Sequence, residues 1–144
     1  MKKLTISLFV ACTSVYALAA PDEFVVQEMA RQTKLSVDDI KKNYDACDSG
    51  VTWPMKICGS YRWMVEDVRL NKIYKRTLTK ARELGYESSL QTAQRAWLTY
   101  RDAACNYEGA AGAGDGTAAG LYVLSCKLDL TKQRADRLEE GLRE

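Results

Sequence analysis

The stretch AQRAWLTYRDAAC (Ala93–Cys105) decides how this chain folds. From Gln94 to Cys105 it carries an amide, two guanidiniums, an indole, a carboxylate and a thiol within twelve residues. Gln94 and Arg101 lie three residues before and four after Trp97, so all three share one face of a helix. An ordinary amphipathic helix carries less polar chemistry on one face. We therefore expect these groups to meet partners on other helices.

Partners are available on the inward faces of the neighbouring predicted helices, at Asn71 and Thr131, with Arg134 beside Thr131. Burying one unpaired polar group costs about 1–3 kcal/mol, and burying a charge costs more. We therefore predict one interhelical network in which Asp67 or Asp102 neutralises Arg101 or Arg134. Asn71, Gln94 and Thr131 would complete its hydrogen bonds.

This network has three interpretations. Buried polar networks more often specify packing than perform chemistry, so the plainest is that it only sets the helix register. The second is a binding surface at one end of the bundle. The third is catalysis, but arginines beside Asp67 and Asp102 would lower their pKa values and make them poor proton donors. The chain also has no histidine, no serine-based triad and no phosphate loop.

The rest of the chain is typical of an all-α protein. It has two prolines and no sustained two-residue alternation of apolar and polar residues. Ser36 and Thr52 are expected to cap helices, Gly85 to end one, and Ser88 with Gln91 to form a capping box. The expected helices cover about 22–32, 36–47, 52–84, a segment starting at 88, and 117–142.

Each long helix has an expected buried stripe at helical spacing. The third is predicted to bury Tyr61, Met64, Val68, Asn71, Tyr74 or Lys75, Leu78 and Ala81. The fourth is predicted to bury Leu90, Ala93, Trp97, Tyr100 or Arg101, and Ala104. The last is predicted to bury Leu121, Leu124, Leu128, Thr131, Ala135, Leu138 and Leu142. Together they predict a small antiparallel helical bundle.

Two surface features of the sequence stay open. Trp53, Trp63 and Trp97 are expected to be core or half-core anchors, but if Trp53 were exposed beside Pro54 it would indicate a contact site. A basic stripe runs along the third helix through Arg69, Lys72, Lys75 or Arg76, Lys80 and Arg82. A solvated helix face is the simpler interpretation of this stripe, and an anionic glycan, a lipid surface or an acidic protein is the alternative.

Residues 109–120 hold five of the nine glycines in the chain. Glycine in the interior of a helix is destabilising, so we predict that this segment is flexible and not helical. Gly112, Gly114 and Gly116 do not follow a strand, which argues against a nucleotide-binding fingerprint.

The cysteines predict two disulfides. Cys47, Cys58, Cys105 and Cys126 remain after removal of the N-terminal segment, and three pairings are possible. We favour local pairing, Cys47 with Cys58 and Cys105 with Cys126, because each pair brackets a turn between helices. A zinc site is disfavoured, since the chain has neither CxxC spacing nor histidine. No cofactor is expected.

Residues 1–19 resemble a secretory signal peptide, with Lys2 and Lys3 before a short apolar run and Ala20 as the mature N-terminus. A lipoprotein anchored through Cys12 is the alternative. Removal leaves 19 basic and 19 acidic residues, so the net charge becomes zero, which argues against general nucleic-acid binding. We expect one domain over residues 20–144, in the periplasm or secreted, as a monomer or weak homo-oligomer without a transmembrane segment.

An ordered set of motifs over residues 45–138 resembles the LprI-type lysozyme inhibitor family, which consists of small exported bacterial proteins. The set comprises Cys47, Thr52-x-x-Met55-x-x-Cys58, Asp67-x-x-Leu70-Asn71-x-x-Tyr74, the stretch 93–105, and Cys126-x-x-x-Leu130-Thr131-x-x-Arg134-Ala135. Its polar members are Asp67, Asn71, Tyr74, Gln94, Arg95, Trp97, Arg101, Asp102, Thr131 and Arg134. The chain departs from the family at Pro54, where Glu is common, and at Gly114-Asp115-Gly116, where Gly-Gly is usual.

The resemblance implies an all-helical protein that is not an enzyme and protects its producer from lysozyme. The lysozyme cleft carries a pair of carboxylates and binds an extended glycan, so an inhibitor need only fill it. The glycine segment is our candidate target-binding loop, with Gly112, Gly114, Asp115, Gly116 and Thr117 as its residues. The alternative is a periplasmic immunity or binding protein that neutralises another toxin or envelope enzyme. A cell-wall enzyme and a structural envelope component are two further alternatives, which the residues support less well.

Overall fold

A computed structural model of the protein describes residues 20–143, and the expected signal peptide and Cys12 lie outside them. The described chain forms five helices and no strand. These are α1 (Glu23–Thr33), α2 (Val37–Asn43), α3 (Thr52–Glu83), α4 (Glu87–Ala113) and α5 (Ala119–Arg143). The predicted all-α architecture is confirmed. None of these helices is both long and apolar enough to cross a bilayer.

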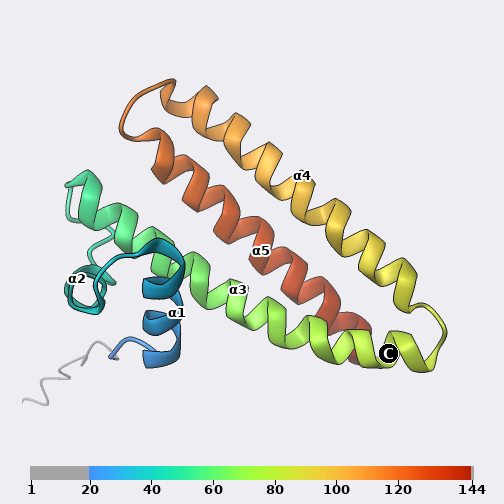
Figure 1. Ribbon diagram of the computed structural model, residues 1–144. Helices are drawn as coiled ribbons and strands as arrows, with labels where there is room; N and C mark the ends of the chain where they lie inside the picture. Colours follow the sequence, from blue (N-terminus) through green and yellow to red (C-terminus); the bar gives the residue numbers. More distant parts are fainter. Residues whose placement is uncertain (1–19, 144) are drawn as a thin grey trace, which may run out of the picture.

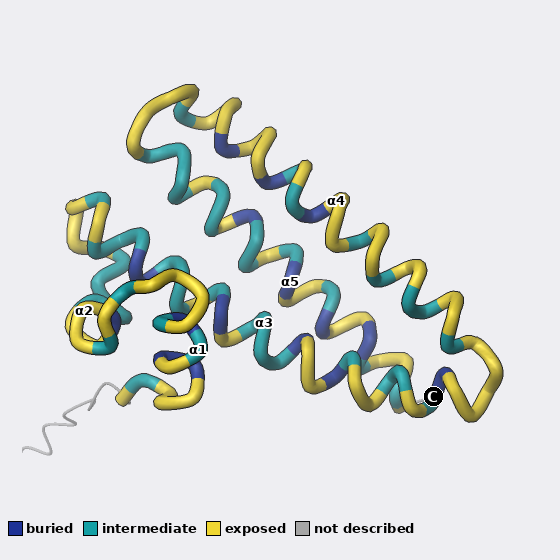
Figure 2. The backbone as a smooth tube through the Cα atoms, viewed as in Figure 1, coloured by how far each residue is buried: buried dark blue, intermediate teal, exposed yellow. Residues whose placement is uncertain are grey.

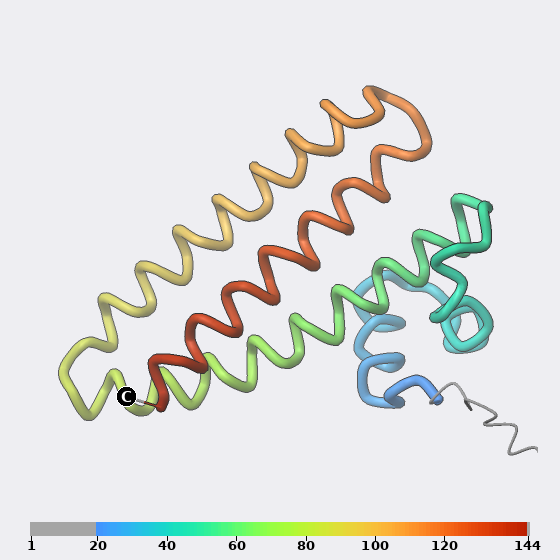
Figure 3. Tube along the Cα trace, turned by 180° about the vertical axis from the view of Figure 1, so that it is seen from behind, coloured from blue at the N-terminus to red at the C-terminus, as the bar shows by residue number. Residues whose placement is uncertain are grey.

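The three long helices form an antiparallel bundle with α5 in the middle (Figures 1 and 3). The α5 helix packs along both α3 and α4, whereas α3 and α4 touch each other far less. The short helices α1 and α2 pack against the N-terminal half of α3. The α4–α5 turn lies at one end of the bundle, and the α3–α4 turn and the C-terminus lie at the other (Figure 1).

Two separate cores hold these helices together. One lies between α1, α2 and α3 and is built by Val25, Val26, Met29, Ile40, Ile57 and Met64. The other lies between α3 and α5 and is built by Leu70, Ile73, Ala135 and Leu138, with Trp97 partly buried against it. The outer side of α4 is largely exposed (Figure 2).

The predicted stripe of α3 is wrong at its centre. Leu70 and Ile73 are buried, whereas Asn71 is exposed. The helix packs on α5 along both halves and also on α1 and α2 along its N-terminal half, so it buries more than one face and no single stripe describes it. On α4, Ala93 and Tyr100 are exposed, and Arg101 takes the inward position.

Helix starts were predicted correctly where a side chain caps the backbone and wrongly where none does. Ser36 Oγ accepts a hydrogen bond from the Asp39 amide at 3.0 Å, as expected. The α3 helix begins after Val51 without a side-chain cap, so Thr52 is not its cap. The α4 helix begins at Glu87, before the expected capping box, and Glu87 pairs with Arg82 across the turn at 2.6 Å. Gly85, with φ of +79°, ends the preceding helix as predicted.

The prediction of a non-helical segment from residue 109 is also wrong, because α4 continues to Ala113. The glycines here allow close packing of two helices. A Cβ at Gly109 would lie 2.5 Å from Cγ2 of Val123 on α5, and one at Gly112 would lie 2.8 Å from the Tyr122 ring. Substitution for glycine would therefore require these α5 side chains, or the helix that carries them, to shift.

Both disulfides follow the local pairing. The Cα atoms are 5.2 Å apart in Cys47–Cys58 and 5.4 Å apart in Cys105–Cys126, within the usual range for a disulfide. The first joins the segment after α2 to the start of α3, and the second joins α4 to α5. Each is expected to contribute about 2–4 kcal/mol by restricting the unfolded chain.

Candidate functional site

The centre of the bundle holds a stack of alternating cations and indoles, which we call the cation–aromatic ladder. Its members, in order, are Arg134, Trp97, Arg101, Trp63 and Lys127. The Arg101 guanidinium carbon lies 5.2 Å from the centre of the Trp97 ring and 5.7 Å from that of Trp63. The outer cations approach the same rings at 5.9 and 5.1 Å. The members of the ladder lie on α3, α4 and α5, so the ladder joins these three helices. Such contacts strengthen when they exclude water.

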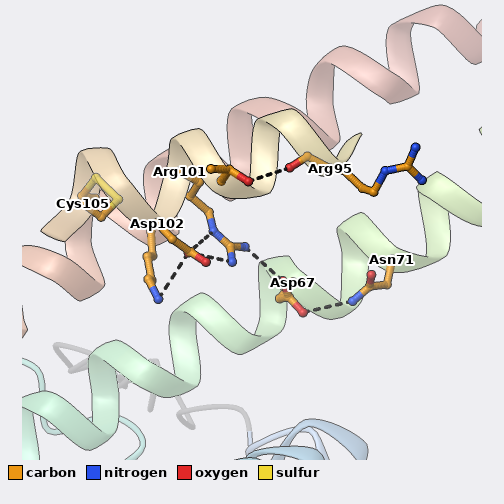
Figure 4. Close-up of polar contacts among 9 residues, drawn as sticks. Asp67, Asn71, Arg95, Arg101, Asp102 and Cys105 are labelled. Carbon is orange, nitrogen blue, oxygen red and sulfur yellow. Dashed lines mark hydrogen bonds and ion pairs between the residues drawn. A yellow bond between two sulfur atoms is a disulfide. The ribbon is translucent and has the colours of Figure 1, made fainter. Parts of the chain in front are cut away.

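Two carboxylates neutralise the buried Arg101 (Figure 4). Asp102 Oδ1 lies 3.0 Å from both Nε and Nη2 of the guanidinium, and Asp67 Oδ1 lies 3.6 Å from Nη1. Lys127 Nζ also reaches Asp102, at 3.5 Å. A buried arginine without counter-charges would destabilise the fold strongly, so Asp67 and Asp102 make the burial of Arg101 possible.

The environment shifts the pKa values of the two carboxylates in opposite directions. Burial raises the pKa of Asp67, and the Arg101 charge and the Asn71 amide offset this only in part. Burial opposes ionisation of Asp102 too, but the Arg101 hydrogen bond and the Lys127 charge outweigh it and lower the pKa of Asp102. Our expectation that arginine lowers both pKa values is therefore wrong for Asp67, because its ion pair is longer and its burial is deeper.

The amides extend the network towards the surface. Asn71 Nδ2 donates to Asp67 Oδ2 at 3.0 Å, and Gln94 Oε1 accepts from Arg134 Nε at 3.0 Å. Thr131 is fully buried, but its hydroxyl has no hydrogen-bond partner within residues 20–143, so the structure does not place it in the network. Across that same range, no three His, Cys, Asp or Glu side chains are grouped to hold a metal ion.

Sequence reasoning missed two members of the ladder. Trp63 was expected to be an apolar anchor and Lys127 was not singled out. Helical spacing could have identified both residues. Trp63 lies four residues before Asp67 and Lys127 lies four before Thr131, so each shares a helix face with a predicted member of the network. What was missing was the knowledge that the Trp63 ring on α3 faces Arg101 on α4 and Lys127 on α5.

Most of the remaining motif residues line an open groove between α3 and α4, with a volume of about 520 Å³. Asp67, Asn71 and Tyr74 lie on its α3 side, and Gln94 and Arg95 lie on its α4 side. Arg95 is exposed and makes no ion pair among the described residues; its Nη2 donates to Thr92 Oγ1 at 3.2 Å. The motif therefore has a buried part that holds the helices together and a surface part that faces solvent.

The predicted target-binding loop lies elsewhere, at the α4–α5 turn (Figure 1). We call residues 114–117 the hairpin tip. Gly114, Asp115, Gly116 and Thr117 are all exposed, and Gly114 has a φ of +52°. Gly112 belongs to the last turn of α4 instead. The loop therefore lies apart from the polar network. It is at the end of the bundle opposite the α3–α4 turn.

Trp53 is the exposed tryptophan that the sequence left open. Its side chain is 57% exposed and it lines a hollow with Lys56, Gly120 and Leu124, where α3 and α5 begin. Exposure of an indole beside Pro54 meets the condition that we set for a contact site.

Comparison with known proteins identifies the family. The family model described as "Lysozyme inhibitor LprI" matches residues 45–138. This chain belongs to the LprI lysozyme inhibitor family. The match covers α3, α4, most of α5 and both disulfides of the LprI-family chain, and it leaves α1 and α2 outside.

A relative is known from Rhizobium meliloti (strain 1021), where it is described as an uncharacterized protein. It is 32% identical to this LprI-family chain over an alignment of 98 residues, and the match covers 60% of this chain and 70% of the relative. No solved structure matches the chain.

Proposed function

We propose that the protein inhibits a lysozyme or a related peptidoglycan hydrolase by inserting the hairpin tip into the glycan cleft of that enzyme. One observation carries this proposal: a member of the lysozyme inhibitor family exposes a narrow, disulfide-braced turn at one end of its bundle. A protruding turn is the shape that enters a cleft, whereas the groove between α3 and α4 is concave and receives a ligand.

Close packing of α4 and α5 next to the hairpin tip keeps the tip narrow. Gly109 and Gly112 let α4 and α5 approach each other closely, and Cys105–Cys126 fixes the two helices before they reach the turn. A turn that is rigid before binding loses little conformational entropy when it binds, and this favours affinity.

The tip also has suitable chemistry. Its glycine backbone can approach the cleft closely. The Gly114 and Gly116 amides already donate to the carbonyls of Ala110 and Ala113, so the N–H groups that can reach the carboxylate pair of the hydrolase are those of Asp115 and Thr117. Asp115 makes no ion pair with any described residue, so its charge remains available for a cationic enzyme surface. Opposite charges of this kind raise the rate of association.

We further propose that the protein acts in the periplasm or outside the cell. Both disulfides need an oxidising compartment, and a lysozyme inhibitor meets its target there. The N-terminal segment would then serve as the signal peptide.

The test is inhibition of chicken-type, goose-type and invertebrate-type lysozymes by the oxidised protein, residues 20–144. We expect near-stoichiometric inhibition of one class. The double variant Asp115→Lys/Thr117→Lys should weaken that inhibition by about tenfold or more, because it reverses the charge of the tip. Asp129→Lys, an exposed change on α5, is the matched control and should inhibit normally.

Two outcomes would contradict the proposal. Equal inhibition by the tip variant and the parent would remove the tip as the binding element. Failure of the folded, disulfide-intact protein to inhibit any of the three classes would move the target to another toxin or envelope enzyme.

A further inference from the structure

We propose that a trench across α3 binds an anionic glycan built of N-acetylated sugars. We use the name trench for two hollows that share Asp67 and Asn71 as lining residues, the groove between α3 and α4 and a second hollow between α1 and α3. This site is separate from the hairpin tip, and the proposal stands whether or not the tip binds a hydrolase.

The shape of the trench suits a chain-like ligand. The α1–α3 hollow has a volume of about 340 Å³ and the α3–α4 groove about 520 Å³. Both are lined by Asp67 and Asn71, so a ligand lying in the two hollows would cross α3 over this hydrogen-bonded pair. Figure 4 shows the pair on the side of α3 that faces α4, with the Arg95 side chain extending beside it.

The network below the trench fixes the direction of two surface amides. Asn71 donates to Asp67 through Nδ2, which leaves its carbonyl oxygen as an acceptor. Gln94 accepts from Arg134 through Oε1, which leaves its NH₂ group as a donor. The trench therefore presents one oriented acceptor and one oriented donor. An N-acetyl group carries the complementary pair, an N–H and a carbonyl.

Each hollow also contains one aromatic side chain. Phe24, 65% exposed, lies in the α1–α3 hollow, and Tyr74 lies in the α3–α4 groove. A flat ring gives the apolar face of a sugar ring a surface to pack on, and the Tyr74 hydroxyl adds a hydrogen-bonding group. The described chain has no strand, so the trench offers no sheet edge to an extended peptide.

The free charges of the trench are positive. Lys72 and Lys75 in one hollow and Arg95 in the other make no ion pair within residues 20–143, whereas the acidic Glu28 is paired with Arg31. Other cations of the basic stripe are occupied: Arg69 bonds Asp136 and Glu139, and Arg82 bonds Glu87. The unpaired cations favour a ligand that carries carboxylates.

Binding would be measured by calorimetry with three probes and the oxidised protein, residues 20–144. The first is a set of soluble glycan strands in which N-acetylglucosamine alternates with N-acetylmuramic acid, whose lactyl group carries a carboxylate. The second is tetra-N-acetylchitotetraose, which is neutral. The third is polyglutamate, which is anionic but has no sugar. We expect the first to bind best, the second about tenfold more weakly because it lacks carboxylates, and the third not at all.

Exposed side chains allow a variant test without damage to the core. The double variant Asn71→Ala/Arg95→Ala should bind the first probe about tenfold more weakly, since it loses one amide contact and one charge. The matched control Asn106→Ala/Arg137→Ala changes exposed residues away from the trench and should bind as the parent does.

Several results would overturn the proposal. These are no binding of either glycan by the folded protein, equal binding of polyglutamate and the anionic glycan, or equal loss of binding in the trench and control variants. If the trench variant instead lost lysozyme inhibition while the parent bound no glycan, the trench would be a protein-docking surface and the glycan assignment would be wrong.

Discussion

The centre of the bundle and the hairpin tip place their polar groups in opposite ways. In the centre, Arg101 is buried and contacts two rings and two carboxylates, so its charge is used inside the protein. At the tip, Asp115 is exposed and makes no ion pair within the described chain. Residues of the first kind hold helices in register, and residues of the second kind remain free to meet a partner. The trench lies between these extremes, because its buried network orients amides that are open to solvent.

The largest effect should follow removal of the central cation. Arg101→Ala should lower the free energy of unfolding by about 3–5 kcal/mol, since it leaves carboxylates without their partner and empties the space between two indoles. Chemical denaturation measures this. Arg137→Ala, at an exposed site on α5, should change stability by less than about 0.5 kcal/mol. Similar small losses in both variants would show that the ladder does not stabilise the bundle.

The two disulfides separate stability from binding. Removing either one, as Cys47→Ala/Cys58→Ala or Cys105→Ala/Cys126→Ala, should lower the free energy of unfolding by about 2–4 kcal/mol. Only the second removes the brace of the tip, so only the second should weaken lysozyme inhibition when both variants are folded. Equal inhibition by the two variants would contradict the assignment of stability to the centre and of binding to the tip.

A pair of glycines tests whether close packing narrows the hairpin. Gly109→Ala should cost about 1–3 kcal/mol of stability, because the added Cβ would lie 2.5 Å from Val123 Cγ2. Gly141→Ala has open space around its Cβ in α5 and should gain up to about 1 kcal/mol from helix propensity. If the two substitutions had the same effect on the melting temperature, the close approach of α4 and α5 would be refuted.

The smallest effect is a contrast in pH dependence between the two carboxylates. The pKa of Asp67 is raised, so the folded state binds its proton more tightly, and the contribution of Asp67 to stability falls as pH rises above about 4. The pKa of Asp102 is lowered, so its contribution is present above its unfolded pKa and is lost as pH falls below about 4.

Denaturation of Asp67→Asn and Asp102→Asn at several pH values would measure this contrast. The stability difference between the parent and Asp67→Asn should decrease with pH above about 4, and that for Asp102→Asn should increase up to about 4. If both stability differences changed with pH in the same direction, the two carboxylates would share one environment.

Much of this fold was predictable from the sequence. Local pairing of the cysteines, the cap at Ser36, the stop at Gly85 and the three long helices depend on residues close together in the chain, and all are confirmed. Arg101 was also found from its spacing to Trp97. These features are local, so their physical causes are visible in the sequence.

Features that depend on contacts between helices were predicted less well. Glycines at 109 and 112 were interpreted as helix breakers, but they lie against Val123 and Tyr122 of α5, and only that packing explains them. Asn71 was placed inside because its spacing fitted a stripe, yet α3 turns a different face to each neighbour. The raised pKa of Asp67 likewise depends on burial beside the other helices.

The sequence by itself determined that this protein is a disulfide-linked helical bundle, because helix periodicity, turns and cysteine spacing act over short distances. Only the tertiary structure decided which polar groups are buried and which face solvent. Exposure depends on where α1, α4 and α5 lie against α3. That arrangement places the hairpin tip at one end of the bundle and the trench over its centre.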